Sequence, residues 1–286
     1  MWLNFTKMQG LGNDFVVLDG VSHQVSISPG QARKLADRHF GVGCDQILLV
    51  EPPSDPDVDF DYRIFNQDGS EVNQCGNGAR CFAKFVHDRH LTSKDLIRVR
   101  TRAGTMEISV NPDRSYSVDL AVPNFEPADI PLAVDQQTAT YAIELDGQTV
   151  AFSALSLGNP HMVIQVEDCA TAPVASWGET MQHHPLFPER VNVGFMQILD
   201  RREINLRVCE RGSGETLACG SGACAAAVAG MRLGLLDEAV LVNLPGGQLK
   251  IEWRGDGEPV RLTGPAKTVF HGKIRWQAKP AKSARK

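Results

Sequence analysis

The fold is decided by two versions of one turn, Gln74-Cys75-Gly76-Asn77-Gly78-Ala79 and Ala218-Cys219-Gly220-Ser221-Gly222-Ala223. Each version places a cysteine in a tight, glycine-rich setting, and the two cysteines are 144 residues apart (219 − 75). An arginine lies twelve residues before each cysteine, and a glutamate lies four residues before it. A turn that recurs with the same flanking charges predicts two halves that fold alike and carry one thiol each.

The repeat runs through the rest of the chain. Gly12-Asn13 matches Gly158-Asn159 and Gln46 matches Asn192, both at an offset of 146 residues. Further matches downstream keep the offset between 142 and 146. A period this long indicates two domains rather than a solenoid, and a chain of 286 residues exceeds one ordinary hydrophobic core.

The two domains are expected to join at the proline-marked stretch 123–131. Residues 1–122 then form the N-terminal half with Cys75, and residues 123–263 form the C-terminal half with Cys219. The segment 264–278 can return to the first half, whereas the basic end 273–286 has little to bury and is expected to fray. If the halves face each other, both thiols line a common cleft between them.

Strands are indicated by alternating or short apolar runs. They are expected at 15–18, 47–50, 62–65, 97–100 and 106–110 in the first half, and at 162–164 and 204–208 in the second. Ser28-Pro29 combines an N-cap residue with proline at the first helical position, which predicts a helix to about Arg38.

A helix is expected to follow each cysteine. After Cys75, apolar residues at i, i+3, i+4 and i+7, beginning at Ala79, form the stripe of a core-facing helix. After Cys219, residues 223–228 are apolar on every side, so this helix is expected to be enclosed by its sheet. The predicted class is α/β (α+β): two pseudo-symmetric domains, each a mostly antiparallel β-structure wrapped around a central helix.

Composition excludes several classes of function. The formal charge of −5 argues against nucleic acid as a partner, because phosphate binding needs a basic face. No apolar run approaches the roughly 20 residues that span a bilayer, and the N-terminus lacks a signal peptide's apolar core. Seven cysteines are an odd number, which argues against a disulfide framework. We therefore expect a cytoplasmic protein with no membrane partner and reduced thiols.

The glycine-rich turn suits a reactive thiol. A helix N-terminus presents N–H groups that no helical carbonyl accepts and carries about half a positive charge. The glycines let a ligand approach these N–H groups closely, so the turn can hold a carboxylate. The same field is expected to lower the pKa of Cys75 and Cys219.

The other cysteines are interpreted as structural. Buried packing is the usual role of this residue type, and we expect it at Cys44, Cys81, Cys169, Cys209 and Cys224. Metal ligation is a weak alternative. Neither the pair Cys75 and Cys81 nor the pair Cys219 and Cys224 has the two-residue spacing of a zinc site, and no histidine lies at a matching place in both halves. We expect no metal site.

Polar residues surround the two turns at matched positions. All are placed at strand ends or in glycine-containing loops: Asn13, Gln46, Asn66, Asn159, Asn192, Glu210 and Arg211. Each asparagine alone is typical of a turn, but the matched set favours a binding site for a small zwitterion. His161 is ambiguous, since it can tune a thiol's protonation or cap a strand.

These residues resemble a known family. Met8–Phe15, the Cys75 turn, Gly158-Asn159-Pro160-His161 and the stretch from Glu210-Arg211-Gly212 through Cys219-Gly220-Ser221-Gly222 are together similar to the diaminopimelate epimerase family. The resemblance covers essentially the whole chain in order. It implies a cofactor-independent isomerase that interconverts LL- and meso-diaminopimelate, in lysine and peptidoglycan-precursor biosynthesis.

The resemblance also implies residue roles. Of the catalytic cysteines Cys75 and Cys219, one as thiolate removes the α-proton while the other as thiol protonates the opposite face. His161 and Glu210 match positions that influence the thiol pKa values. The substrate contacts that it implies are Asn13, Gln46, Asn66, Gly76, Asn77, Asn159, Asn192, Glu210, Arg211, Gly220 and Ser221. It implies a homodimer too, with Phe270 where the family often has a tyrosine in the dimer contact.

Two other interpretations stay open. Proline racemases and hydroxyproline epimerases share the two-cysteine core, but a proline ring would favour an apolar wall over Arg211 and its neighbouring amides. A non-catalytic amino acid sensor, or a redox switch built on Cys75 and Cys219, would use the same residues without moving the α-proton.

Overall fold

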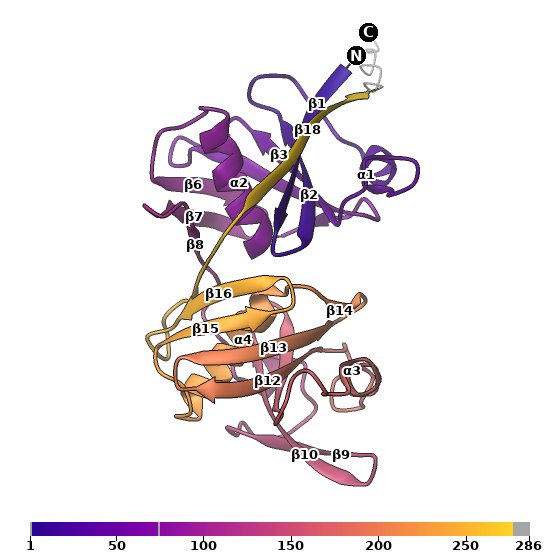
Figure 1. Ribbon diagram of the computed structural model, residues 1–286, viewed down its shortest axis with the longest axis vertical. Helices are drawn as coiled ribbons and strands as arrows, with labels where there is room; N and C mark the ends of the chain where they lie inside the picture. The colour runs from indigo at the N-terminus through magenta and orange to yellow at the C-terminus, as the bar shows by residue number, and fades with distance from the viewer. Residues whose placement is uncertain (1, 74, 277–286) are drawn as a thin grey trace. The chain divides into compact units, whose positions relative to one another are not determined.

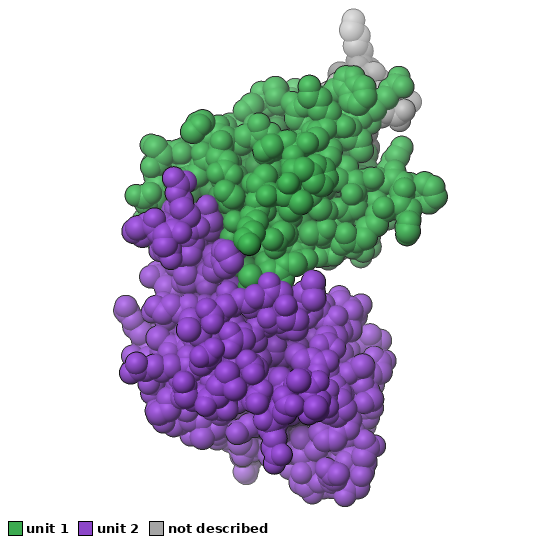
Figure 2. Space-filling model, viewed as in Figure 1, with its two compact units in different colours: residues 1–109, 266–286 green, residues 110–265 purple. Residues whose placement is uncertain are grey.

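The computed structural model describes residues 2–73 and 75–276. The chain divides into two compact units (Figure 2): unit 1 comprises Met1–Ser109 and Ala266–Lys286, and unit 2 comprises Val110–Pro265. Both units combine strands with few helices (Figure 1), so the predicted α/β (α+β) class is confirmed. No helix of the described residues is long and apolar enough to cross a membrane.

Unit 1 is a mostly antiparallel sheet around one helix. Its elements are β1 (Trp2–Gly10), β2 (Asn13–Asp19), α1 (Pro29–Ala36), β3 (Gln46–Glu51), β4 (Phe60–Asn66), β5 (Glu71–Val72), α2 (Gly76–Asp88), β6 (Leu96–Thr101), β7 (Gly104–Val110) and β18 (Lys267–Arg275). The pairs β2–β3 and β4–β6 are parallel, and the other pairs are antiparallel. Helix α2 packs against β1, β2 and β3.

Unit 2 repeats this plan. Its elements are β8 (Tyr116–Asp119), the 3₁₀-helix η1 (Pro127–Asp129), β9 (Tyr141–Leu145), β10 (Gln148–Ser156), β11 (Pro160–Gln165), α3 (Val174–Gln182), β12 (Asn192–Asp200), β13 (Glu203–Glu210), β14 (Gly214–Thr216), α4 (Gly220–Arg232), β15 (Ala239–Leu244), β16 (Gly247–Glu252) and β17 (Arg261–Gly264). The parallel pairs are β11–β12 and β13–β15. Helix α4 packs against the strands from β10 to β13 and from β15 to β17.

The register repeats as well as the order. Phe15 lies opposite Gln46 in the β2–β3 pair, and His161 lies opposite Asn192 in the β11–β12 pair. Both members of the second pair are 146 residues beyond those of the first. The pseudo-symmetry expected from the sequence is therefore present in the strand pairing itself.

The apolar patterns form the helices that they predict. In α2, the stripe that begins at Ala79 and continues through Phe82, Ala83 and Val86 is fully buried. In α4, every residue from Ala223 to Val228 is fully buried, so the sheet encloses this helix on all sides. Helix α1 begins after Ser28 as expected, where the backbone N–H of Ser28 donates to Gln31 Oε1 at 2.9 Å.

The sheet of unit 1 is buried on both faces near its centre. Phe15 and Leu48 lie beside Gly78 of α2, whereas Val16 and Ile47 belong to a cluster with α1 on the other face. This explains why 47–50 is a continuous apolar run rather than an alternating one.

Two expectations about segment boundaries differ from the structure. The N-terminal segment of unit 1 ends at Ser109 rather than at 122, because β8 pairs with β17 and so belongs to unit 2. Residues 273–275 were expected to fray but form the end of β18, where Asn4 pairs with Lys273. The side chains of Ile274 and Trp276 pack against the α1 cluster, which anchors this end. Residues 277–286 of the predicted tail lie outside the described residues.

Candidate active site

Each central helix begins with a cysteine as its N-cap residue. Cys75 precedes α2 and Cys219 precedes α4, both in extended backbone. The Cys75 sulfur accepts the backbone N–H of Gly78 at 3.3 Å, and the Cys219 sulfur accepts that of Gly222 at the same distance. Each sulfur therefore lies at the positive end of a helix dipole, in the place that a serine or aspartate oxygen usually occupies.

The two thiols differ in their surroundings. Cys75 is half-buried, whereas Cys219 is only 4% exposed. Burial raises the pKa of the Cys219 thiol well above its usual range, and the charge of Glu210 and its hydrogen bond to the thiol raise it further. These effects outweigh the hydrogen bonds from Gly222 and Ser221 that lower it. The expectation of a lowered pKa is therefore wrong for Cys219, because burial and a neighbouring carboxylate dominate over the helix dipole.

Asn13 links the start of β2 to the first turn of α2. Its Nδ2 donates to Asp45 Oδ2 at 3.0 Å, and its Oδ1 accepts Asn77 Nδ2 at 3.2 Å. Asn77 is the second residue of α2 and is buried. The amide that the sequence singled out thus contacts the helix end that carries Cys75.

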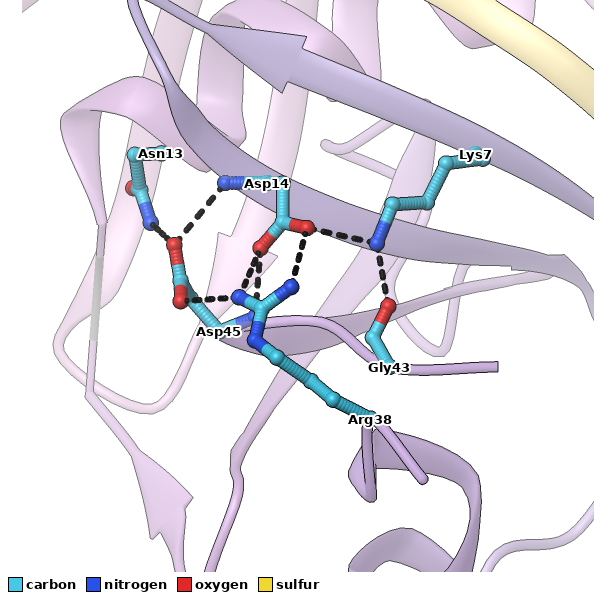
Figure 3. A network of polar contacts seen from close by, with 6 residues as sticks. All are labelled: Lys7, Asn13, Asp14, Arg38, Gly43 and Asp45. Atoms are coloured by element: carbon cyan, nitrogen blue, oxygen red, sulfur yellow. Dashed lines mark hydrogen bonds and ion pairs between the residues drawn. The ribbon is translucent and has the colours of Figure 1, made fainter. Parts of the chain in front are cut away.

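A charged network lies behind Asn13 (Figure 3). The Arg38 guanidinium donates to both oxygens of Asp14, at 3.0 and 2.8 Å, and to Asp45 Oδ1 at 2.8 Å. Lys7 forms an ion pair with Asp14 at 2.6 Å and also donates to the carbonyl of Gly43. Burial alone would raise the pKa of the Asp14 carboxyl, but hydrogen bonds from Arg38 and Lys7 outweigh it and hold this pKa well below its usual range.

The matching amide in unit 2 has different partners. Asn159 Nδ2 donates to Ser221 Oγ at 3.2 Å, and Asn159 Oδ1 lies 3.1 Å from His161 Nε2. Ser221 Oγ lies 3.7 Å from Cys219 Sγ, so a hydrogen-bond chain connects His161 to the thiol. Burial, assisted by the charge of Arg211, lowers the pKa of His161 to about 3. His161 is therefore neutral near pH 7, and it can influence the Cys219 thiol only through these hydrogen bonds.

The remaining predicted site residues lie at strand ends in two matching groups. In unit 1, Gln46 begins β3 and donates to Asn66 Oδ1 at 3.0 Å, at the end of β4. The Gln46 Oε1 atom is buried and has no hydrogen-bond partner among the described residues.

In unit 2, Asn192 begins β12, Glu210 ends β13 and Arg211 follows it. Asn192 accepts the backbone N–H of Arg211 at 2.8 Å, and the Arg211 guanidinium donates to the carbonyl of Glu189 at 3.0 Å. Glu210 accepts the hydroxyl of Thr216. Each unit therefore places these predicted residues at the ends of its own strands, where they contact one another.

The flanking charges of the repeat form matching ion pairs. Arg63 donates to both oxygens of Glu71 at 2.8 and 3.1 Å, and Arg207 does the same to Glu215 at 2.6 and 2.9 Å. These bidentate pairs tie β5 to β4 and β14 to β13, directly before each cysteine turn.

The other cysteines are buried inside their units. Burial raises the pKa of Cys44 and Cys81 to about 12, and it also raises the pKa values of Cys169 and Cys209. Thiols of this kind are inert at neutral pH. Across residues 2–73 and 75–276, no group of three or more His, Cys, Asp or Glu side chains lies close enough to hold a metal ion.

Comparison with known proteins decides the family. The family model described as diaminopimelate epimerase matches residues 5–125 and 153–269. The chain belongs to the diaminopimelate epimerase family. The diaminopimelate epimerases of Ectopseudomonas mendocina, Pseudomonas entomophila and Azotobacter vinelandii are 56%, 57% and 56% identical to it over 275 residues, which cover 96% of this chain and 100% of each relative. The resemblance inferred from the motifs is confirmed.

Solved structures of other protein families have the same fold. A hydroxyproline epimerase from Agrobacterium vitis, crystallised with trans-4-hydroxy-L-proline, matches with a TM-score of 0.68 at 14% identity, covering 96% of this chain and 92% of that one. A phenazine biosynthesis protein of the PhzF family from Bacillus anthracis matches with a TM-score of 0.66 at 15% identity, covering 96% and 100%. At such identities the likeness shows the fold alone, and it confirms the expected diaminopimelate epimerase-like fold.

Sequence reasoning missed the charged residues around Asn13. Asp14, Arg38 and Asp45 were not singled out, although Asp14 directly follows Asn13 and Asp45 directly precedes Gln46. The repeat does not mark these carboxylates, because the matching residues in unit 2 are Pro160 and Val191.

Proposed function

We propose that this chain is a cofactor-independent diaminopimelate epimerase, which interconverts the LL and meso forms with Cys75 and Cys219 as its two acid–base groups. The observation that carries this proposal is the pair of N-cap thiols, each accepting a helix N–H at 3.3 Å, in a chain of the diaminopimelate epimerase family. Each turn supplies a sulfur that can exchange a proton and a helix end that favours an anion.

The reacting carboxylate is held by the two helix starts. The backbone N–H groups of Gly76 and Asn77 open α2, and those of Gly220 and Ser221 open α4. At the start of a helix, such groups are available to an external acceptor. These donors stabilise the charge that develops on the carboxylate when the α-proton leaves.

The two cysteines alone can remove one proton from the α-carbon and return another, with no cofactor. A thiolate at Cys75 takes the α-proton, while the Cys219 S–H gives its proton to the opposite face of the same carbon. Cys75 then ends as the thiol and Cys219 as the thiolate, and the reverse reaction exchanges the roles. The raised pKa of Cys219 favours its protonated state at rest, which suits it as the proton donor.

The surrounding amides and charges recognise the rest of the substrate. Gln46 Oε1, buried without a partner among the described residues, suits a substrate ammonium group. Arg211 suits the distal carboxylate. His161 and Glu210 act on Cys219, the first through Asn159 and Ser221 and the second directly. The contacts assigned to the substrate are Asn13, Gln46, Asn66, Gly76, Asn77, Asn159, Asn192, Glu210, Arg211, Gly220 and Ser221.

The protein is proposed to act as a cytoplasmic homodimer. A compartment that keeps thiols reduced is required if both cysteines are to exchange protons. The β1–β18 ribbon exposes the neighbouring apolar residues Val269 and Phe270 by 56% and 47%, and we assign the dimer contact to this part of β18.

Hydrogen exchange in deuterated water tests the proposed function. Incubation with LL-diaminopimelate should produce meso-diaminopimelate with deuterium at the inverted α-carbon. Mass spectrometry detects the deuterium, and chiral chromatography separates the two forms. A sensor or redox switch would leave the α-position protonated. Turnover of proline or hydroxyproline, with none of diaminopimelate, would favour the proline-type alternative.

A further inference from the structure

Asn13 is a side-chain amide whose orientation is fixed by the chemistry of its neighbour. Its nitrogen lies 3.0 Å from Asp45 Oδ2, and a carboxylate oxygen can only accept a hydrogen bond. The amide nitrogen must therefore face Asp45, and the amide oxygen must face Asn77. One hydrogen of the NH₂ group is used by Asp45, and the second remains to donate to a ligand.

The accepting oxygen is itself held in place. Asp45 Oδ2 also accepts the backbone N–H of Asp14 at 3.0 Å, and Asp14 Oδ1 accepts the backbone N–H of Asp45 at 2.8 Å. The other oxygen, Asp45 Oδ1, accepts Arg38. The two Asp45 oxygens therefore accept from different groups: Oδ2 accepts from Asn13 and Oδ1 accepts from the exposed Arg38 guanidinium (Figure 3).

In unit 2, no carboxylate of the described residues holds the matching Asn159 amide. The position that matches Asp45, 146 residues further on, is the buried Val191, and Pro160 stands where unit 1 has Asp14. The partners of Asn159 are a hydroxyl and an imidazole, each able to donate or accept. The amide is locked by partner chemistry in unit 1 alone.

We propose that Asp45 is a positioning residue, which fixes the Asn13 amide so that its second N–H is presented to a carboxylate oxygen of the substrate. This inference rests on the proposed role of Asn13 as a substrate contact. Without Asp45, the amide can flip and turn its oxygen toward the substrate carboxylate; both groups are acceptors, so no hydrogen bond forms between them.

Asp45→Ala and Asp45→Asn separate positioning from a structural ion pair. Asp45→Ala removes the acceptor, and the KM for LL-diaminopimelate should rise about tenfold with kcat within about threefold. Asp45→Asn can keep its one carbonyl oxygen on Asn13 and the Asp14 N–H while losing only Arg38, so its KM should stay within about threefold of the wild type. Equal losses in both variants would overturn the proposal, because both break the ion pair with Arg38.

The matched control is Asp237→Ala. Asp237 is 35% exposed against 38% for Asp45, and it pairs with Arg201 and Arg202 away from the residues assigned to the substrate. Its loss should leave KM and kcat unchanged. Arg38→Gln is a second probe should Asp45→Ala fail to fold: it breaks the ion pairs but keeps Asp45 on Asn13, and a tenfold rise in its KM would contradict positioning.

A double-mutant cycle with Asn13→Ala gives the sharpest result. If Asp45 acts through Asn13, then Asp45→Ala adds no further rise in KM once Asn13 is alanine. An additive tenfold rise would refute positioning while leaving the epimerase intact. Absence of α-deuterium in the wild type would instead refute the proposed function itself, so the two failures are distinguishable.

Discussion

Cys75 and Cys219 share one backbone role but differ in what surrounds the sulfur. Residue 66, nine before Cys75, is a neutral asparagine, whereas residue 210, nine before Cys219, is a glutamate. Burial raises the pKa of Cys219, and the Glu210 carboxylate raises it further. Differences in burial and in this neighbouring charge therefore make two like turns chemically unequal, which an enzyme needs if one thiol is to give a proton while the other takes one.

His161 predicts a specific pH dependence of stability. Its pKa is about 3 in the folded chain, because it is buried, and about 6.5 in an unfolded one. Below pH 6.5 the unfolded chain binds a proton that the folded chain does not, so stability falls as the pH falls toward 3. At pH 5 this residue should lower the free energy of unfolding by about 2 kcal/mol relative to pH 7.

Urea unfolding at pH 7 and pH 5 measures this contribution. His161→Gln should lose about 2 kcal/mol less than the wild type between the two pH values, whereas His23→Gln, at an exposed position, should behave like the wild type. If His161→Gln has the same pH dependence as the wild type, then His161 binds its proton between pH 7 and pH 5 equally well in the folded and the unfolded chain, which would contradict this prediction.

At the scale of elements, the start of α2 depends on a glycine for space. A Cβ on Gly78 would lie 2.3 Å from the hydroxyl oxygen of Tyr62. This hydroxyl is buried and has no hydrogen-bond partner among the described residues. The matching Gly222 has no such hydroxyl near it, since a Cβ there would first meet Cys219 Sγ and Val208 at 3.1 Å.

Gly78→Ala should destabilise the fold by about 2 kcal/mol, as overpacking does. Tyr62→Phe removes an unsatisfied hydroxyl and should be neutral or stabilising by about 1 kcal/mol. The double variant should be more stable than Gly78→Ala alone. Gly30→Ala is the control, because a Cβ in that helix would meet nothing closer than 3.9 Å. Denaturant titration measures all four, and a failure of Tyr62→Phe to relieve Gly78→Ala would contradict the proposed clash.

The sequence predicts those elements whose pattern is local. The helix after Cys219 follows from residues 223–228 being apolar throughout, and all of them are buried. The end of β18 was missed because its burial comes from pairing with β1, at the opposite end of the chain. Helix α3 was missed because its N-cap residue, Pro173, makes no side-chain hydrogen bond to the helix.

The candidate site shows the same division. Positions at strand ends, such as Asn13 and Gln46, could be predicted because the repeat marks them twice. Asp45 could not, since its matching residue is Val191 and the repeat gives no signal there. The raised pKa of Cys219 depends on its depth of burial, which the helix-dipole argument does not contain.

At the scale of the whole molecule, the β1–β18 ribbon predicts self-association. The register shifts between Lys7 and Met8, so Val269 has no opposite residue in β1. Val269 and its neighbour Phe270 are both exposed, and Phe270 makes an edge contact with Phe5 at 5.9 Å between ring centroids. Phe270→Glu would place a charge on this apolar surface and should convert a dimer to monomers in light scattering. Phe40→Glu, at an 86% exposed phenylalanine elsewhere in unit 1, should remain dimeric. A dimeric Phe270→Glu variant would assign the interface to another surface.

The central claim is that each half of the chain supplies the acid–base group for one face of the same carbon. NMR of α-proton exchange in deuterated water tests it directly with Cys75→Ala and Cys219→Ala. We predict that neither variant epimerises, and that each exchanges the α-proton of a different diastereomer without inversion, because the remaining thiolate reaches one face only. Exchange of the same diastereomer by both variants, or near-normal epimerisation by either, would contradict the account.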